Sequence, residues 1–236
     1  VHEGGHALYE LHVGRELSRT CLGGGVSMAI HESQSRFYEN IIGRSRAFCG
    51  VIYPWLREHF APRLDDVSLE DFYRMINKAQ PSLIRTEADE LTYCLHIMVR
   101  YELERRMFAG ELTAHDLPAQ WNRLYKAYLG VDVPNDREGI LQDSHWAGGS
   151  IGYFPSYAIG SAYGAQYLRQ MQKDFDVSAA VATGRLTRIN GWLEEKIWKY
   201  GCMKDPTPLF ESVCGPFDPT CYTAYLRDKF TEVYGL

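Results

Sequence analysis

Apolar residues recur every three to four positions along most of the chain, which is the period of a helix with one buried face. In the first dozen residues, for example, Val1, Leu8 and Leu11 fit such a face. No segment shows a convincing strand-like alternation of apolar and polar residues. The pattern therefore predicts a mainly α fold, with helices over 1–13, 30–60, 69–79, 84–109, 116–129, 155–174, 187–200 and 219–233.

Several residues mark where these helices should begin, end or break. Ser68 is a good N-cap for the helix that follows it, and Gly110 and Gly130 stand where two helices should end. Pro54 should interrupt the helix over 30–60, because proline removes a backbone donor. The glycine-rich segment 20–28 favours a loop or a short β edge strand beside the first helix, and 202–221 favours a long irregular connection.

Composition limits the classes of protein to consider. The chain has 236 residues, 45% of them hydrophobic, which is enough for one domain or two closely packed lobes. Thirty acidic residues against 25 basic ones give a net charge of −5, so nucleic acid is not an expected partner. No run of about 18 apolar residues exists, and we expect no membrane span.

The cysteines favour a reducing compartment. They form no CxxC pairs and show no regular spacing, so they indicate reduced thiols rather than a disulfide framework or a second zinc site. We therefore expect a cytoplasmic protein. The residues concerned are Cys21, Cys49, Cys94, Cys202, Cys214 and Cys221.

The most informative motif opens the chain, at His2-Glu3-Gly4-Gly5-His6. Side chains at positions i and i+4 of a helix lie on one face, so His2 and His6 can hold one metal ion. Glu3 would then lie near the open side of that ion, where it can accept and return a proton. This is the H-E-x-x-H pattern of metalloproteases. The two glycines weaken the helix, but they can let a substrate backbone approach the metal.

Catalytic zinc takes three protein ligands and leaves one position for water, so a third ligand is needed. The segment that begins at His31 carries two candidates, Glu32 and Glu39, two turns apart on one predicted helix. Spacing alone does not choose between them. We expect Glu32 as the ligand and Glu39 as a group that supports a ligand from behind. The alternative for each is a glutamate exposed to solvent on a helix surface.

Four blocks of sequence resemble the carboxypeptidase Taq family of metallocarboxypeptidases. They are HEGGH at 2–6, HESQ at 31–34, IRTEAD at 84–89 and GILQDSHW at 139–146. The resemblance implies His2, His6 and Glu32 as ligands and Glu3 as general base and acid. It also implies a helical zincin-like fold with a long substrate cleft, zinc or cobalt as the metal, broad side-chain tolerance and a homodimer.

One departure from the family matters as much as the match. Family members carry roughly as much chain again before HEGGH, including an HPF block and a DxRxT block that do not occur here. We therefore interpret residues 1–236 as the C-terminal portion of a single metallocarboxypeptidase domain.

The third block bears on the choice of substrate. A carboxypeptidase must recognise a free terminal carboxylate, and an arginine can do so with two parallel hydrogen bonds. Arg85 stands at the entry of the helix predicted over 84–109, and Asp89, one turn later, could hold its guanidinium. The alternative is an ordinary surface ion pair. The resemblance favours a role for Arg85 in binding the carboxylate. His96, on the same helix, is better explained as a packed histidine than as a ligand.

The fourth block combines rings, small residues and polar groups. Peptide hydrolysis builds negative charge on the carbonyl oxygen, and an imidazole or a tyrosine hydroxyl can stabilise it. His145, with Tyr153 or Tyr157, could serve in this way. Gln142 and Asp143 could position that histidine or contact the substrate. Either tyrosine could equally be a core residue with a satisfied hydroxyl.

The sequence thus predicts a metal-dependent carboxypeptidase that releases single C-terminal residues from peptides. A zinc endopeptidase or a dipeptidase of the same helical class would share the metal site but need no carboxylate clamp. An inactive fragment is the third alternative.

Overall fold

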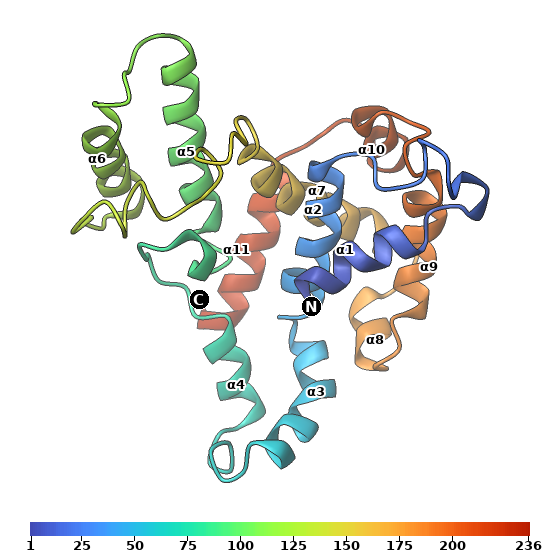
Figure 1. The fold of residues 1–236 in the computed structure, drawn as a ribbon. Helices are drawn as coiled ribbons and strands as arrows, with labels where there is room; N and C mark the ends of the chain where they lie inside the picture. Colours follow the sequence, from blue (N-terminus) through green and yellow to red (C-terminus); the bar gives the residue numbers. More distant parts are fainter. The chain divides into compact units, whose positions relative to one another are not determined.

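The computed structural model describes residues 1–236, which form two compact units. Unit 1 combines Val1–Asn77 with Ile159–Leu236, and unit 2 is Lys78–Ala158. Both are built of helices and turns without any β-strand (Figure 1), so the predicted mainly α fold is confirmed. None of the helices is both long and apolar enough to span a bilayer.

Unit 1 contains most of the helices. The bounds are α1 His2–Leu11, α2 Met28–Arg36, α3 Arg46–His59, α4 Leu69–Ile76, α8 Val177–Ala182, α9 Thr187–Lys196, α10 Pro206–Cys214 and α11 Thr220–Tyr234, with the larger part of α7 Pro155–Met171. Short turns of 3₁₀-helix lie at Arg15–Leu17 and Trp198–Tyr200. The core of this unit is largely aromatic, with Tyr9, Phe37, Tyr167, Trp198 and Phe210 all buried.

Unit 2 is smaller and consists of α5 Tyr93–Phe108 and α6 Leu117–Leu129, the first residues of α7 and connecting turns. Val99 and Leu103 of α5 pack against Trp121 and Tyr125 of α6 in the unit's core. Gly130 ends α6 in a left-handed conformation with a φ of 72°, as the sequence predicts. A 3₁₀ turn at Arg85–Glu87 precedes α5.

The segment predicted as one helix over 30–60 is three elements. A π-helix at Phe37–Ile42 follows α2 directly, and a short break at 43–45 precedes α3. The expected interruption at Pro54 is wrong, because α3 continues through it. The carbonyl that Pro54 leaves without a helical donor belongs to Gly50, which is exposed, so water can satisfy it.

Two expectations for irregular segments also need correction. Residues 20–28 contain no β strand; they form turns whose backbone N–H groups bond to nearby side chains instead. The connection over 202–221 contains α10, which begins with Pro206 in its first turn, where the missing N–H costs nothing. Its Leu209 and Phe210 are fully buried in the core of unit 1. The N-cap at Ser68 is confirmed as a full capping box with Asp71.

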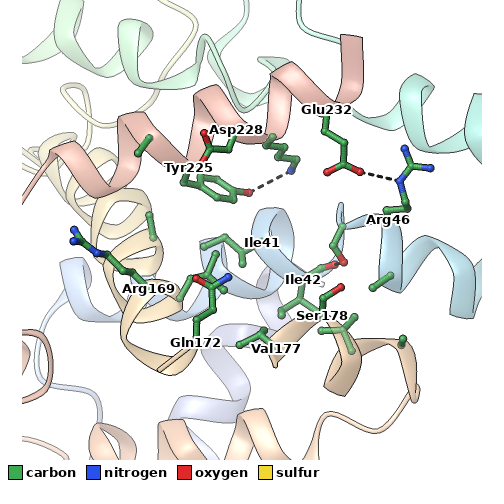
Figure 2. A pocket seen from close by; sticks show the side chains of 18 of the residues that line it. Ile41, Ile42, Arg46, Arg169, Gln172, Val177, Ser178, Tyr225, Asp228 and Glu232 are labelled. Carbon is green, nitrogen blue, oxygen red and sulfur yellow. Dashed lines mark hydrogen bonds and ion pairs between the residues drawn. The ribbon is translucent and has the colours of Figure 1, made fainter. Parts of the chain in front are cut away.

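Unit 1 also has a hollow of about 1060 Å³ among α3, α7, α8 and α11 (Figure 2). Ile41, Ile42 and Val177 line it with apolar surface, and charged side chains such as Arg46 and Glu232 stand at its edge. None of the residues predicted to act on substrate or metal belongs to this hollow.

Candidate functional site

His2 and His6 lie one turn apart on α1 and both turn their Nε2 atoms toward Glu32 on α2. The Nε2 of His2 is 3.6 Å from Oε2 of Glu32, and that of His6 is 4.0 Å from Oε1. One ligand atom from each of the three residues lies within 4.8 Å of the others. For bonds of about 2.1 Å to a tetrahedral ion, the ligand atoms would be about 3.4 Å apart. Small side-chain rotations therefore suffice to fit such an ion.

Two glycines explain how these helices approach so closely. A Cβ on Gly5 of α1 would stand 2.6 Å from the Cα of Ser35, and one on Gly160 of α7 would stand 2.5 Å from the Cβ of Glu32. The expectation that Gly5 admits substrate is therefore wrong, because Gly5 is buried against α2. Gly4 faces open space, with nothing within 4 Å of an added Cβ.

Glu39 supports the site from behind. Its Oε2 lies 2.7 Å from Nδ1 of His2, which leaves the Nε2 of that ring directed toward Glu32. Burial raises the pKa of Glu39, but the hydrogen bond with His2 and the charges of Arg36 and Arg44 outweigh burial and lower it overall. Glu39 is thus an anion at neutral pH. The π-helix that carries it is an element often found at functional sites.

Glu32 is more deeply buried than the neighbouring carboxylates of Glu39 and Glu10. It is only 3% exposed, and its side chain accepts a hydrogen bond from the hydroxyl of Ser35 at 2.9 Å. Its other close neighbours are the two imidazoles, and burial lowers the pKa of His6 despite the charges of Glu32 and Glu3. A buried carboxylate is costly unless a cation pairs with it. The donor set therefore fits a divalent metal such as zinc.

Glu3 stands in the first turn of α1, in the sequence between the two histidines, and is exposed. Its negative charge acts on His6, where it opposes the effect of burial. The carboxylate is therefore accessible to solvent, on the same helix as the two histidines.

Arg85 lies in the 3₁₀ turn before α5, not on the long helix. The prediction that Asp89 holds its guanidinium is wrong. Asp89 instead accepts hydrogen bonds from the backbone and side chain of Thr92, at 2.9 and 2.8 Å. The guanidinium of Arg85 donates to Oδ1 of Asp143 from Nε and Nη2, at 2.9 and 2.7 Å, and to the hydroxyl of Tyr93. Asp143 is 58 residues away in the sequence, so no helical spacing could reveal the pair.

Arg100 completes this cluster and was not predicted. It is fully buried on α5 and donates to Oδ2 of Asp143 at 2.6 Å and to the side-chain oxygen of Gln142 at 2.8 Å. Gln142 in turn accepts from the backbone N–H of Arg85. The sequence does contain a sign that Arg100 is buried: it follows Val99 and precedes Leu103 by three residues, on the apolar face of its helix. Two guanidinium groups thus share one carboxylate.

His145 lies beside the tyrosines with which it was predicted to act. Its Nε2 is 3.0 Å from the hydroxyl of Tyr157, and its ring centroid is 5.5 Å from that of Tyr153. The buried Nδ1 has no hydrogen-bond partner; the nearest carboxylate oxygen, on Asp143, is 4.0 Å away. Burial and the charge of Arg85 lower the pKa of His145. It is therefore neutral at pH 7 and can donate from one nitrogen.

These three rings line a hollow of about 660 Å³ within unit 2. The remaining lining comes from the loop before α7, with small side chains at Ser144, Ala147, Gly148 and Ser150. The guanidinium carbon of Arg85 lies 4.9 Å from the centre of the Tyr157 ring, so the charged cluster adjoins the hollow. Unit 2 therefore offers hydrogen-bond donors beside a positively charged cluster.

The sequence and the fold both match those of known proteins. Residues 1–230 match the family described as carboxypeptidase Taq (M32) metallopeptidase. The chain belongs to this family. Curated relatives include carboxypeptidase 1 of Bacillus subtilis, 46% identical over 99% of this chain, and thermostable carboxypeptidase 1 of Pyrococcus furiosus, 45% identical over 98%. The resemblance inferred from the four sequence blocks is thereby confirmed.

Solved structures of the carboxypeptidase Taq family have the same fold. The M32 carboxypeptidase from Deinococcus radiodurans R1 matches all of this chain with a TM-score of 0.96 at 43% identity. Our chain covers 48% of that structure's chain, and 47% and 46% of the two curated relatives. It thus spans about half the length of the relatives that it matches.

Proposed function

We propose that this chain carries the metal-binding part of a metallocarboxypeptidase that releases single amino acids from the C-terminus of peptides. The observation that supports this most is the convergence of His2, His6 and Glu32, two imidazoles and a buried carboxylate, from two helices fixed by Gly5. We further propose that the chain is a portion of a longer catalytic domain, with a long cleft for the peptide.

In this proposal, His2, His6 and Glu32 hold one divalent ion, zinc or alternatively cobalt. When bound, such an ion polarises a peptide carbonyl and makes a water molecule more acidic. The Glu3 carboxylate takes a proton from the attacking water and returns it to the leaving amine. Glu39 keeps the proton of His2 on Nδ1, so that Nε2 is free to bind.

Unit 2 supplies the recognition of substrate in this proposal. Arg85 uses three of its five N–H groups on Asp143 and Tyr93, and the other two can bind the terminal carboxylate. Gln142 and Asp143 hold Arg85 in place. His145 donates a hydrogen bond to the carbonyl oxygen as its charge grows, with Tyr157 or Tyr153 as a second donor.

Metal content and peptide hydrolysis test the proposal. We expect one zinc per chain by atomic emission, and hydrolysis of an N-blocked dipeptide with a free C-terminus. Chains without stoichiometric zinc would contradict the mechanism. Stoichiometric zinc without hydrolysis would favour the inactive fragment.

Arg85→Ala separates a carboxypeptidase from an endopeptidase of the same class. Loss of the arginine should lower kcat/KM far more for peptides with a free C-terminus than for their C-terminal amides, because only the former carry the charge that Arg85 binds. Equal losses on both would favour the endopeptidase. The homodimer implied by the resemblance is a separate prediction, which sedimentation equilibrium tests.

A further inference from the structure

Two polar side chains, His31 and Glu10, stand in a row behind His6. The Nδ1 of His6 is 3.2 Å from Nδ1 of His31 on α2, and the Nε2 of His31 is 2.8 Å from Oε1 of Glu10 on α1. The same oxygen of Glu10 accepts the backbone N–H of Gly25 at 2.9 Å. These contacts form a continuous chain of hydrogen bonds from the turn at 20–28 to a predicted metal ligand.

The chemistry of the row determines where each proton lies. A carboxylate can only accept, so Glu10 requires a proton on Nε2 of His31. A neutral His31 then has a lone pair on Nδ1, and His6 must donate its own Nδ1 proton to it. The Nε2 of His6, which faces Glu32, is left with a free lone pair. The reverse assignment would put a proton on that Nε2 and block it as a ligand.

The glycine-rich turn is shaped around this row. A Cβ on Gly25 would stand 2.2 Å from Nε2 of His31 and 2.8 Å from the ring of Tyr9. Gly24 adopts a φ of +141°, which side chains rarely allow. Tyr9 holds the turn from inside: its hydroxyl accepts the N–H of Val26 at 3.2 Å, and its ring packs on His31 at 4.8 Å. Gly25 is thus explained by its contact with His31 rather than by a strand.

His2 and His6 are supported differently. A single carboxylate, Glu39, meets His2 directly, whereas His6 reaches its carboxylate, Glu10, through an intervening imidazole. Both arrangements end in an anion, and both leave Nε2 toward Glu32. The outer partners of a metal-binding histidine fix its tautomer and its orientation.

We propose that His31 and Glu10 are positioning residues that hold His6 in the tautomer and orientation needed to bind metal through Nε2. The proposal rests on the metal site put forward under Proposed function, and it assigns a role to the histidine of the HESQ block and to the turn at 20–28. Neither residue contacts the ion itself.

Two substitutions of His31 test the row. His31→Phe keeps a ring against Tyr9 but removes both nitrogens, so it should weaken zinc binding about 10–100-fold. His31→Asn places an amide oxygen where Nδ1 stood, so it should restore much of the affinity. Competition with a chromophoric chelator gives the dissociation constant. The visible absorption of bound Co²⁺, which reports ligand geometry, should shift in His31→Phe and return toward wild type in His31→Asn.

Substitutions of Glu10 and Gly25 test the end of the row that is farther from His6. Glu10→Ala should weaken zinc binding in the same direction, and Glu10→Gln less, because an amide oxygen can still accept from His31. Gly25→Ala should disturb His31 by steric contact. Glu58→Ala, at an exposed glutamate on α3, is the matched control and should leave affinity unchanged.

The outcomes separate this inference from the proposed function. Wild-type chain that binds no zinc would overturn the metal site and the row together. Wild-type chain that binds zinc, with His31→Phe and Glu10→Ala equal to it in affinity and in Co²⁺ spectrum, would overturn the row alone. Circular dichroism and the Tm of the metal-free variants identify any that fail to fold. Because Glu10 is half exposed, Glu10→Ala keeps the test decisive if His31→Phe does not fold.

Discussion

The candidate metal centre of unit 1 and the arginine cluster of unit 2 both bury charged groups. Negative charge is in excess in the first and positive charge in the second. In unit 1, the buried Glu32 has two imidazoles and a hydroxyl around it, and no arginine or lysine forms an ion pair with it. In unit 2, Arg85 and Arg100 share Asp143, so the cluster lacks negative charge. A cation completes the first arrangement and a carboxylate the second. Each unit therefore lacks the charge that its proposed ligand would bring.

The largest effect is expected when the proposed proton acceptor is removed from unit 1 and the proposed metal ligands are kept. Glu3→Gln should lower kcat/KM about 10²–10⁴-fold, since general base catalysis contributes that much. Zinc content should stay the same, because Glu3 is not a ligand. A rate close to wild type in active enzyme would remove Glu3 from the mechanism.

A second test removes the shared anion of unit 2. Asp143→Asn leaves two buried guanidinium groups without their counter-charge, and we expect unit 2 to lose about 3–5 kcal/mol of stability. Zinc affinity should not change, because the ligands belong to unit 1. Urea titration followed by tryptophan fluorescence measures the loss. Asp132→Asn, in an exposed pair with Lys126, is the control and should change little; a similar loss there would contradict the argument.

Acid should also affect unit 2 through His96. Burial lowers the pKa of His96 to about 4. The unfolded chain, with an ordinary pKa near 6.5, binds the proton more readily, so stability falls as pH drops from 6.5 toward 4. The expected loss is about 3 kcal/mol at 1.36 kcal/mol per unit of pKa. His96→Leu should flatten this slope in urea titrations at several pH values; an unchanged slope would assign it to other groups.

The smallest effect concerns the approach of α1 to α2. Gly5→Ala should cost about 1–3 kcal/mol and weaken zinc binding, because its Cβ meets the backbone of Ser35. Gly4→Ala is the matched control: it enters open space and should gain up to about 1 kcal/mol of helix propensity. Equal effects from the two, in thermal unfolding of the metal-free chain, would contradict the packing role of Gly5.

The sequence predicts unit 1 better than unit 2 for a physical reason. HEGGH is a local pattern, and one turn of helix is enough to bring His2 and His6 together. The choice between Glu32 and Glu39 required the packing of α1 on α2, which spacing does not reveal. The resemblance carried by the four sequence blocks implied Glu32 as the ligand.

In unit 2, the decisive contacts join residues far apart in the chain. Asp143 replaces Asp89 as the partner of Arg85, and Arg100 enters from the interior of a helix. Long-range pairing of this kind depends on loops whose course no periodicity specifies. Two predictions about helix ends were wrong for similar reasons. Helix α3 continues through Pro54 because the carbonyl left without a donor is solvated, and α10 forms because Leu209 and Phe210 are buried in the core of unit 1.

Glycine on two sides of α2 has a practical consequence for anyone who redesigns this protein. At Gly5 and Gly160 the neighbouring helices approach α2 with their main-chain atoms, because neither glycine has a side chain to hold the helices apart. The distance between Glu32 and α1 is therefore set largely by contacts of the main chain, whose covalent geometry is nearly constant. Replacement of aromatic by aliphatic residues elsewhere in the core can therefore change the Tm while the distances among His2, His6 and Glu32 stay the same.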